Sequence, residues 1–140
     1  LTKLPGNASI SKELDKRISA QGAFCAAYAD LDKFKEYNDY YGFAWGDKLI
    51  QHTASVIYNA IKELGEENDF IGHIGGDDFI FITSPDSIEN ICKKIIYDFD
   101  MSIPSFYKEE DREKGYIVIK DRKGIVNEMP FITISIGVVT

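Results

Sequence analysis

Apolar residues recur every three or four positions along three stretches of the chain, the spacing that one buried face of an α-helix requires. Residues typical of helix ends lie beside them, such as Ser9 as an N-cap before the first and Gly65 after the second. The three predicted helices cover residues 10–18, 44–64 and 88–99. A shorter helix is predicted over residues 32–41, where a glycine follows.

Four short apolar runs have the length and composition of β-strands. They cover residues 23–29, 70–74, 79–83 and 131–139. A glycine turn joins the second and third runs into a predicted hairpin. A smaller hairpin is predicted around the turn at 121–124, and the polar stretch 105–115 is predicted to be irregular.

The order of these elements predicts the fold class. Without the first helix and the small hairpin, the order is close to the β-α-β-β-α-β unit of ferredoxin-like proteins. We therefore expect an α+β fold with a central, mainly antiparallel sheet flanked by helices and a small extra hairpin. The 140 residues are a usual domain length and contain no repeat or linker, so a single domain over 1–140 is expected.

Two acidic clusters fall at points that this fold brings together. Asp30 and Asp32 follow the first strand, and Asp77 and Asp78 lie in the hairpin turn. Because the first strand lies beside the hairpin in such a sheet, the clusters become neighbours. Carboxylates suit Mg²⁺, which needs only one or two of them beside substrate phosphates. Either cluster alone is also typical of a plain turn or helix cap, but together they predict a metal site.

Residues near these clusters suit a nucleotide. Gly75 and Gly76 lack a Cβ, so a phosphate or sugar can approach the backbone. The helix after the first strand offers its N-terminal N–H groups to phosphate, and Lys35 adds positive charge. Asn38 and Asp47 can pair with guanine, because a carboxylate accepts from its ring and exocyclic N–H groups together. Each of these two is alternatively a solvated polar position.

Other polar and aromatic residues are expected to be structural. His73 in a strand and His52 on a helix are expected to be packed or boundary residues rather than metal ligands. The aromatic residues between 37 and 45 are expected to pack together, and the charged segment 108–114 to be a solvated surface. Cys25 and Cys92 are too few for a disulfide framework, so both are expected to be free thiols of a reducing compartment.

The charge narrows the class of partner. Sixteen Lys and Arg residues against 23 Asp and Glu residues give a net charge of −7. This argues against nucleic acid and against direct contact with an anionic membrane, but it allows a nucleotide bound with divalent cations. No apolar run approaches the ~18 residues of a membrane helix, and no signal peptide is visible. We expect a cytoplasmic fragment of a longer protein, because the chain starts without Met; the parent protein could be membrane-anchored.

Four sequence blocks occur in a fixed order from the first residue almost to the last. They are L-T-K-L-P-G-N at 1–7, D-L-D-K-F-K at 30–35 with N-D at 38–39 and G-D at 46–47, G-G-D-D-F at 75–79, and T-I-S-I-G at 133–137. In kind and order they resemble the motifs of the GGDEF domain family, the diguanylate cyclases. The resemblance implies a palm-like nucleotidyl cyclase fold that condenses two GTP into cyclic di-GMP with release of pyrophosphate.

The resemblance also implies the metal site. Asp30 and Asp77 would be ligands of the cofactor Mg²⁺ or Mn²⁺, two ions per active site, and the Leu31 carbonyl would assist them. Asp77 and Asp78 would be catalytic, with Asp78 near the metals or the attacking 3′-hydroxyl. Gly75-Gly76 would give room to the ribose and α-phosphate.

The rest of the GTP site is implied in the same way. Asn38 and Asp47 would read guanine. Lys35, also catalytic, and the backbone N–H groups of Lys33 and Phe34 would hold phosphates. Two domains, each with one GTP, would face each other as a homodimer, and sensor or regulatory domains would be covalently linked.

The chain departs from the family pattern at several positions. Asp78 replaces the usual Glu, His73 the usual Arg and Phe43 the usual His. The family's last helix is missing, and the segment 102–129 is longer than the common pattern. The family's product-inhibition motif R-x-x-D reads E-E-N-D at 66–69, so product inhibition at that site is not expected.

Two other interpretations stay open. The substitutions favour a degenerate, non-catalytic module that binds GTP and controls a neighbouring domain. A palm-fold enzyme with a G-G-D-D hairpin, such as the polymerase-like subunits of CRISPR effectors, is disfavoured by the L-T-x-L-P and D-x-D-x-F-K blocks.

Overall fold

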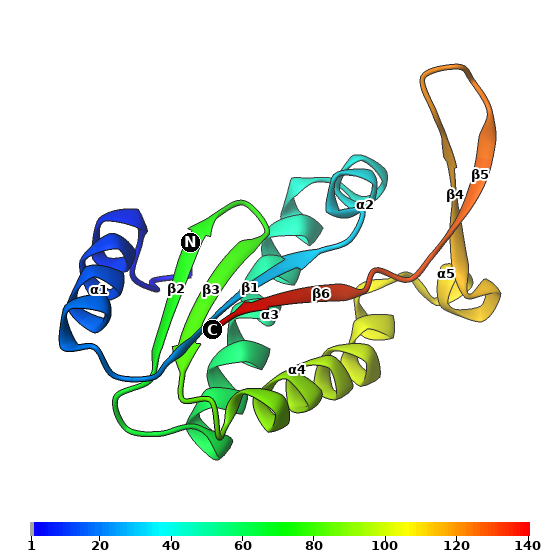
Figure 1. The fold of residues 1–140 in the computed structure, drawn as a ribbon. Coiled ribbons are helices and arrows are strands. Elements are labelled where there is room, and N and C mark those ends of the chain that lie inside the picture. Colours follow the sequence, from blue (N-terminus) through cyan, green and yellow to red (C-terminus); the bar gives the residue numbers. More distant parts are fainter. Residues whose placement is uncertain (1) are drawn as a thin grey trace.

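A four-stranded antiparallel sheet forms the centre of the computed structural model, which describes residues 2–140. Leu1, the first residue of the opening block, lies outside the described residues. The strands are β1 (Cys25–Leu31), β2 (Phe70–Gly75), β3 (Asp78–Thr83) and β6 (Ile134–Val139), in the order β2-β3-β1-β6 (Figure 1). The predicted α+β fold is confirmed, because this is the strand order of a β-α-β-β-α-β unit.

Helices pack against one face of this sheet. The helices of the core unit are α2 (Phe34–Tyr41), α3 (Phe43–Leu64) and α4 (Ile88–Ser102). Side chains alternate between the two faces of a strand, and one set on β1 and β3 joins the apolar stripes of α3 and α4 in the core. Its members include Ala27, Ala29, Phe79, Phe81, Leu49, Ile57, Ile91, Ile95 and Phe99.

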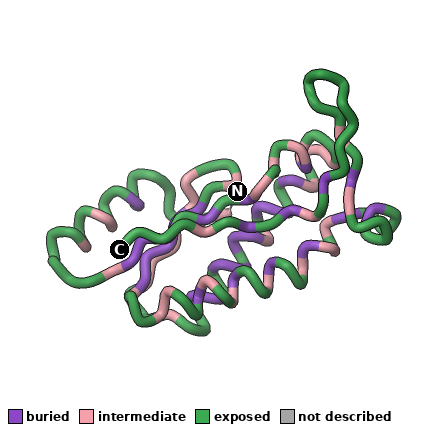
Figure 2. The backbone as a smooth tube through the Cα atoms, turned by 45° about the vertical axis from the view of Figure 1, so that its right-hand side comes forward, coloured by how far each residue is buried: buried purple, intermediate pink, exposed green. Residues whose placement is uncertain are grey.

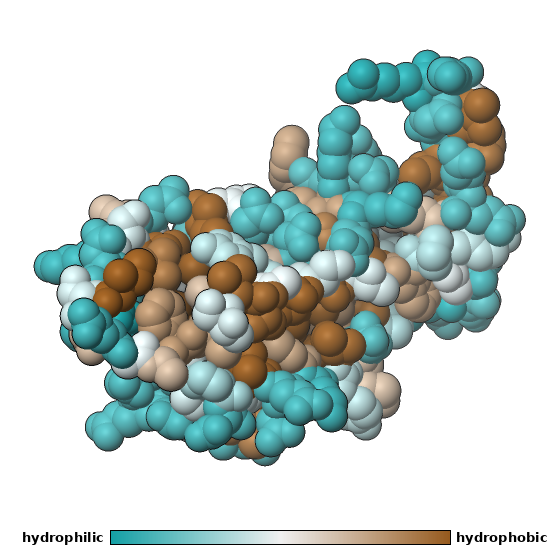
Figure 3. All heavy atoms as spheres, in the orientation of Figure 1, coloured by the Kyte–Doolittle hydropathy of each residue, from teal (hydrophilic) through white to brown (hydrophobic). Residues whose placement is uncertain are grey.

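The opposite face of the sheet is only partly covered. Helix α1 (Asn7–Ala20) packs beside β2, where Ile10 is buried. Between α1 and β6 a mostly apolar groove of about 440 Å³ remains, and Tyr28 and Val139 are among the residues that line it. Figure 3 shows brown apolar side chains gathered across this face. Because side chains alternate along β1, the exposed Tyr28 and Asp30 both lie on this side of the sheet.

The segment between α4 and β6 is more ordered than predicted. It contains a 3₁₀ turn η1 (Ile103–Phe106), helix α5 (Glu109–Lys114) and the hairpin β4 (Tyr116–Lys120) and β5 (Val126–Pro130). The small hairpin was expected, and its exposed tip projects from the body (Figure 2). The expectation of an irregular stretch at 105–115 is wrong, because η1 and α5 occupy most of it. The solvated surface expected at 108–114 is confirmed except at Asp111, which is buried against tyrosines of α2.

Several element boundaries also differ from the predicted ones. Helix α1 begins at Asn7 rather than after Ser9, since the Ile10 N–H already donates to the Gly6 carbonyl (2.9 Å). Strand β6 begins at Ile134 rather than at residue 131, because the Ile132 N–H donates to the Tyr107 hydroxyl instead of a strand (2.9 Å).

Two expectations about single features can be compared with the structure. Cys25 is buried, Cys92 is half-buried, and both are free thiols as predicted. Within residues 2–140, no helix is both long and apolar enough to cross a membrane.

Candidate functional site

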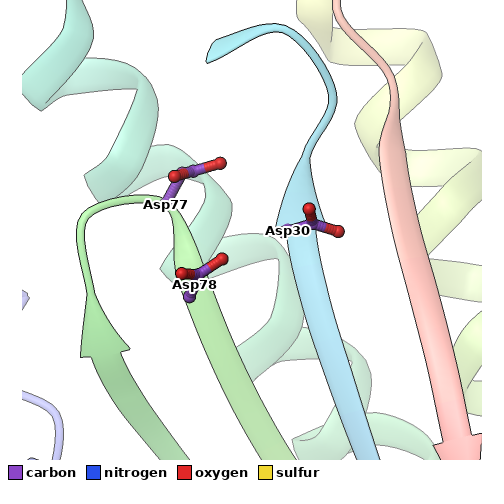
Figure 4. Close-up of side chains that lie close together, drawn as sticks. All are labelled: Asp30, Asp77 and Asp78. Atoms are coloured by element: carbon purple, nitrogen blue, oxygen red, sulfur yellow. The ribbon is translucent and has the colours of Figure 1, made fainter. Parts of the chain in front are cut away.

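Three carboxylates converge where β1 meets the β2–β3 turn. Asp30 of β1 lies opposite Asp78 of β3 in the strand register, and Asp77 occupies the turn. Each of the three offers an oxygen within 4.8 Å of the others. Figure 4 shows Asp77 at the turn, Asp78 on β3 and Asp30 on the adjoining strand. The predicted meeting of the two acidic clusters is therefore found, and the oxygen set could hold a metal ion.

The carboxylates destabilise each other's charged forms. Partial burial raises the pKa of Asp30, and the negative charges of Asp32, Asp77 and Asp78 raise it further. Burial and Asp77 raise the pKa of Asp78, while His73 acts in the opposite direction. A compensating interaction is the Leu31 N–H, which donates to Asp77 Oδ2 (3.2 Å). A divalent cation would relieve this repulsion between the carboxylates, and their oxygen atoms are suitable ligands for such an ion.

Glycine shapes the turn that carries Asp77. Gly76 has a φ of +53° and Gly75 a φ of +153°, and space beside both Cα atoms is open. Such backbone conformations favour glycine. His73 Nε2 donates to the Gly76 carbonyl (2.9 Å), its Nδ1 lies 3.0 Å from the Thr2 hydroxyl, and its ring stacks on Phe79. As predicted, His73 is packed into the structure, here as a brace of the turn.

The start of α2 faces the same end of β1. Lys33 adopts a left-handed conformation (φ 63°) directly before the helix, and Lys33 and Lys35 are exposed. The first N–H groups of a helix have no partner within it, and no side chain among residues 2–140 caps α2. The N–H groups of its first turn are therefore available to an anion.

Asp32 has a different role from Asp30. Its carboxylate accepts hydrogen bonds from Thr133 Oγ1 (2.7 Å) and Ser135 Oγ (2.6 Å), and its N–H donates to the Thr133 carbonyl (2.9 Å). Asp32 therefore ties the β1–α2 turn to β6 and does not cap α2. The sequence showed the T-x-S pattern but not this function of its hydroxyls.

Asn38 presents an unpaired amide between α2 and α3. Its Oδ1 atom is buried and makes no hydrogen bond within the described chain. Gly46 lies against it so closely that a Cβ at Gly46 would stand 2.0 Å from Asn38 Oδ1. Buried polar atoms are normally paired, so this amide has unused bonding capacity. Asp47, the next residue of α3, is exposed.

A pocket and several aromatic side chains surround the carboxylates and α2. A pocket of about 250 Å³ opens beside the carboxylates, lined by Tyr28, Ala29, Asp30, Ile74, Asp78 and Phe79. Aromatic packing is confirmed for Tyr37, Tyr41 and Trp45, whose rings are in contact. The same expectation is wrong for Phe43, whose side chain is 77% exposed. His52 is half-buried and hydrogen-bonds Ser102, as expected of a boundary residue.

Comparison with known families agrees with this geometry. Residues 1–114 match the family described as "Diguanylate cyclase, GGDEF domain". The chain belongs to the GGDEF domain family. An uncharacterised protein of Mycobacterium tuberculosis is 33% identical over 141 residues, covering 99% of this chain and 19% of that protein. Diguanylate cyclase DgcP of Pseudomonas aeruginosa is 30% identical over 93 residues, covering 64% of this chain and 13% of that protein. This GGDEF chain thus spans less than a fifth of these relatives.

Solved structures share the fold of this GGDEF domain. The active GGEEF domain of a diguanylate cyclase from Vibrio cholerae superposes with a TM-score of 0.68 at 17% identity, over 97% of this chain and 76% of that one. The GGDEF domain of DgcB from Caulobacter crescentus, in complex with c-di-GMP, gives 0.66 at 23% identity, over 98% and 72%. At these identities the likeness concerns the fold.

Proposed function

We propose that this domain is a diguanylate cyclase, which condenses two GTP into cyclic di-GMP and releases pyrophosphate. The convergence of Asp30, Asp77 and Asp78 within 4.8 Å carries the proposal. This all-oxygen set suits Mg²⁺ or Mn²⁺, which when bound supplies positive charge to the triphosphate and to the attacking 3′-hydroxyl. Asp30, Asp77 and the Leu31 carbonyl would hold two such ions.

The residues around the carboxylates would bind and orient GTP. Lys35 and the N–H groups of Lys33 and Phe34 would hold phosphates through charge and hydrogen bonds. Asn38 and Asp47 would pair with the guanine edge; the unpaired Asn38 amide supports this assignment.

Two further groups of the turn would act at the reacting atoms. The open backbone at Gly75 and Gly76 would let the ribose and α-phosphate approach. Asp78 is one methylene shorter than the usual Glu. It would accept a proton from the 3′-hydroxyl or bind a metal ion through water.

Formation of the cyclic product would need two copies of the domain. Each copy would bind one GTP, and the 3′-hydroxyl of each GTP would attack the α-phosphate of the other. The longer protein would bring the two copies together through linked sensor or regulatory domains.

The first test uses the purified domain with Mg²⁺ and GTP, and cyclic di-GMP is assayed. We expect Asp77→Asn to lower turnover by about a hundredfold or more. Even mutation of residues that only hydrogen-bond a metal ligand typically lowers metal affinity or activity by about 10–100-fold. Asp15→Asn, an exposed carboxylate on α1, is the matched control. Equal turnover and Mg²⁺–GTP affinity in Asp77→Asn would refute the assignment.

A non-catalytic GTP-binding module is the second candidate. His73 is engaged by Gly76 and Thr2, and the exposed Phe43 offers no polar group where the family usually has one. Mg²⁺–GTP binding by calorimetry without formation of cyclic di-GMP would support this candidate over the first.

A further inference from the structure

Tyrosines of α2 are bonded to the long segment between α4 and β6. The Tyr37 hydroxyl donates to the Phe106 carbonyl (2.5 Å), and the Tyr41 hydroxyl donates to Asp111 Oδ2. The Lys108 N–H in turn donates to the Tyr41 hydroxyl (2.9 Å). Side-chain hydroxyls of α2 therefore join this helix to η1 and α5, which lie at the same end of the sheet as α2 (Figure 1).

Asp111 is the centre of these contacts. It is 4% exposed and is the only charged side chain that is buried among residues 2–140. No cation pairs with it in that part of the chain; its carboxylate receives the Tyr41 hydroxyl and, at 3.4 Å, the Tyr40 hydroxyl. Burying a carboxylate without a cation is costly, and in some proteins buried polar or charged groups serve to fix one geometry rather than to add stability.

Tyr41 is a dependable donor to this carboxylate. Burial raises the pKa of Tyr41, and its hydrogen bond to Asp111 raises it further, so the hydroxyl stays protonated at neutral pH. Its ring also stacks on Trp45 of α3 at 4.9 Å between centroids. One tyrosine thus joins α2, α3 and α5.

These contacts lie on the turns of α2 that carry the proposed GTP-binding residues. Asn38 and Lys35 belong to the same eight-residue helix as Tyr37 and Tyr41. The segment also reaches the other side of the site, because the Tyr107 hydroxyl accepts from Ile132 N–H, directly before Thr133, which holds Asp32. A short helix has little stability of its own, so such external bonds decide its placement.

We propose that Asp111 is a positioning residue for the guanine end of the GTP site, acting through Tyr41 to hold α2 so that Asn38 faces the base. The inference rests on the proposed function, because it assumes that Asn38 binds guanine. Asp111 belongs to the long 102–129 segment, and at 108–114 within that segment the sequence predicted only a solvated surface.

The test compares Asp111→Asn, Tyr41→Phe and the double variant with wild type. In calorimetry we expect each single variant to bind Mg²⁺–GTP about tenfold more weakly, the scale of a lost hydrogen bond to a charged group. The double variant should match Tyr41→Phe, because Asp111→Asn only removes the charge of the acceptor, whereas Tyr41→Phe removes the hydroxyl that bonds both Asp111 and the Lys108 N–H. In turnover assays, KM for GTP should rise while kcat at saturating GTP changes little.

Hydrogen exchange separates positioning from general instability. Amides of α2 should exchange faster in Asp111→Asn, whereas those of β1 and β3 should not change. Glu113→Gln is the matched control, since Glu113 lies exposed on α5 and loses the same charge.

The outcomes distinguish this inference from the proposed function. Unchanged α2 exchange together with unchanged GTP affinity in Asp111→Asn would overturn the inference. Loss of affinity that is accompanied by faster exchange throughout the sheet would also overturn it, because Asp111 would then serve overall stability. If wild type bound no GTP, the proposed function would fail, and the positioning role with it, whatever the exchange data showed.

Discussion

At the scale of single residues, the cluster of Asp30, Asp77 and Asp78 suits a metal ion but lowers the stability of the metal-free domain. Asp30 and Asp78 face each other across β1 and β3, and burial and neighbouring charges raise the pKa of both. Functional sites commonly carry such unfavourable groupings. The fold holds the carboxylates together although they repel, which is understandable if a cation joins them.

Asp78→Asn should therefore stabilise the metal-free domain. The change removes one negative charge from the cluster and keeps the side-chain shape, so we expect the melting temperature in EDTA to rise by about 1–4 °C. Scanning calorimetry with and without Mg²⁺ measures this, and the added stabilisation by Mg²⁺ should shrink. Asp86→Asn, an exposed carboxylate of the β3–α4 turn, controls for total charge. A lower melting temperature in EDTA for Asp78→Asn than for the control would contradict the prediction.

At the scale of elements, the contact between α2 and α3 sets the position of the Asn38 amide. Gly46→Ala would place a Cβ 2.0 Å from Asn38 Oδ1. The end of the Asn38 side chain can move aside, and alanine favours a helix over glycine by up to about 1 kcal/mol, so stability should change little. Guanine binding should suffer instead.

We expect Gly46→Ala to bind GTP about tenfold more weakly than wild type does. ATP, which the wild-type domain should bind more weakly than GTP, should bind the variant and the wild type equally. Calorimetry with both nucleotides gives the two affinities, and thermal unfolding checks the fold. Equal affinity of the wild-type domain for ATP and GTP would show that Asn38 and Asp47 do not read guanine. Gly22→Ala, at a glycine with open space around it, is the control.

The turn before β2 carries Glu66 and Asp69, where the family usually has its product-inhibition motif. Asp69 Oδ2 already accepts from the Glu66 N–H (2.9 Å) and the Thr83 hydroxyl (2.7 Å), so this carboxylate is engaged within the fold. A pocket of about 360 Å³ lies beside it, but the nearby Arg17 is paired with Glu13 (2.7 Å) and with the Asn68 carbonyl. No free guanidinium is thus presented by Arg17.

We predict that cyclic di-GMP does not bind at this turn. Glu66 would repel a doubly negative dinucleotide where an Arg would attract it. Calorimetric titration of cyclic di-GMP into the domain should show no micromolar binding there, and Glu66→Arg should introduce some. Micromolar binding that Asp69→Asn or Arg17→Gln abolishes would contradict the prediction. The β4–β5 turn, which carries Arg122, lies at the other end of the molecule and cannot supply the guanidinium (Figure 1).

At the scale of the whole molecule, the proposed reaction needs two copies of an acidic chain. Each copy has a net charge of −7, so two copies repel at low ionic strength. We expect the turnover per domain to rise with protein concentration, because the catalytically competent state is a pair. Initial rates over a dilution series measure this dependence, and moderate salt should raise the rate at a given concentration, because it screens the repulsion between the two copies. A rate per domain that is independent of concentration for a monomer in light scattering would contradict the requirement for two copies.

The sequence alone determined the strands and helices of the core unit and the acidic residues of the candidate metal site. The spacing of apolar residues and the glycine turns specify the order of helices and strands locally. The connection of a hairpin is also local, so the positions of Asp77 and Asp78 could be predicted without long-range information. The adjacency of Asp30 followed from topology, because few sheet orders fit such a string of elements.

Tertiary structure decided what depends on contacts between distant segments. Asp32 is bonded to Thr133 and Ser135, about one hundred residues away, so its turn-like sequence could not indicate that role. The burial of Asp111 depends on hydroxyls of Tyr40 and Tyr41, which precede it by 71 and 70 positions. The charged segment 108–114 has the composition of a solvated surface and is exposed except at Asp111, which only the packing of α2 against it buries.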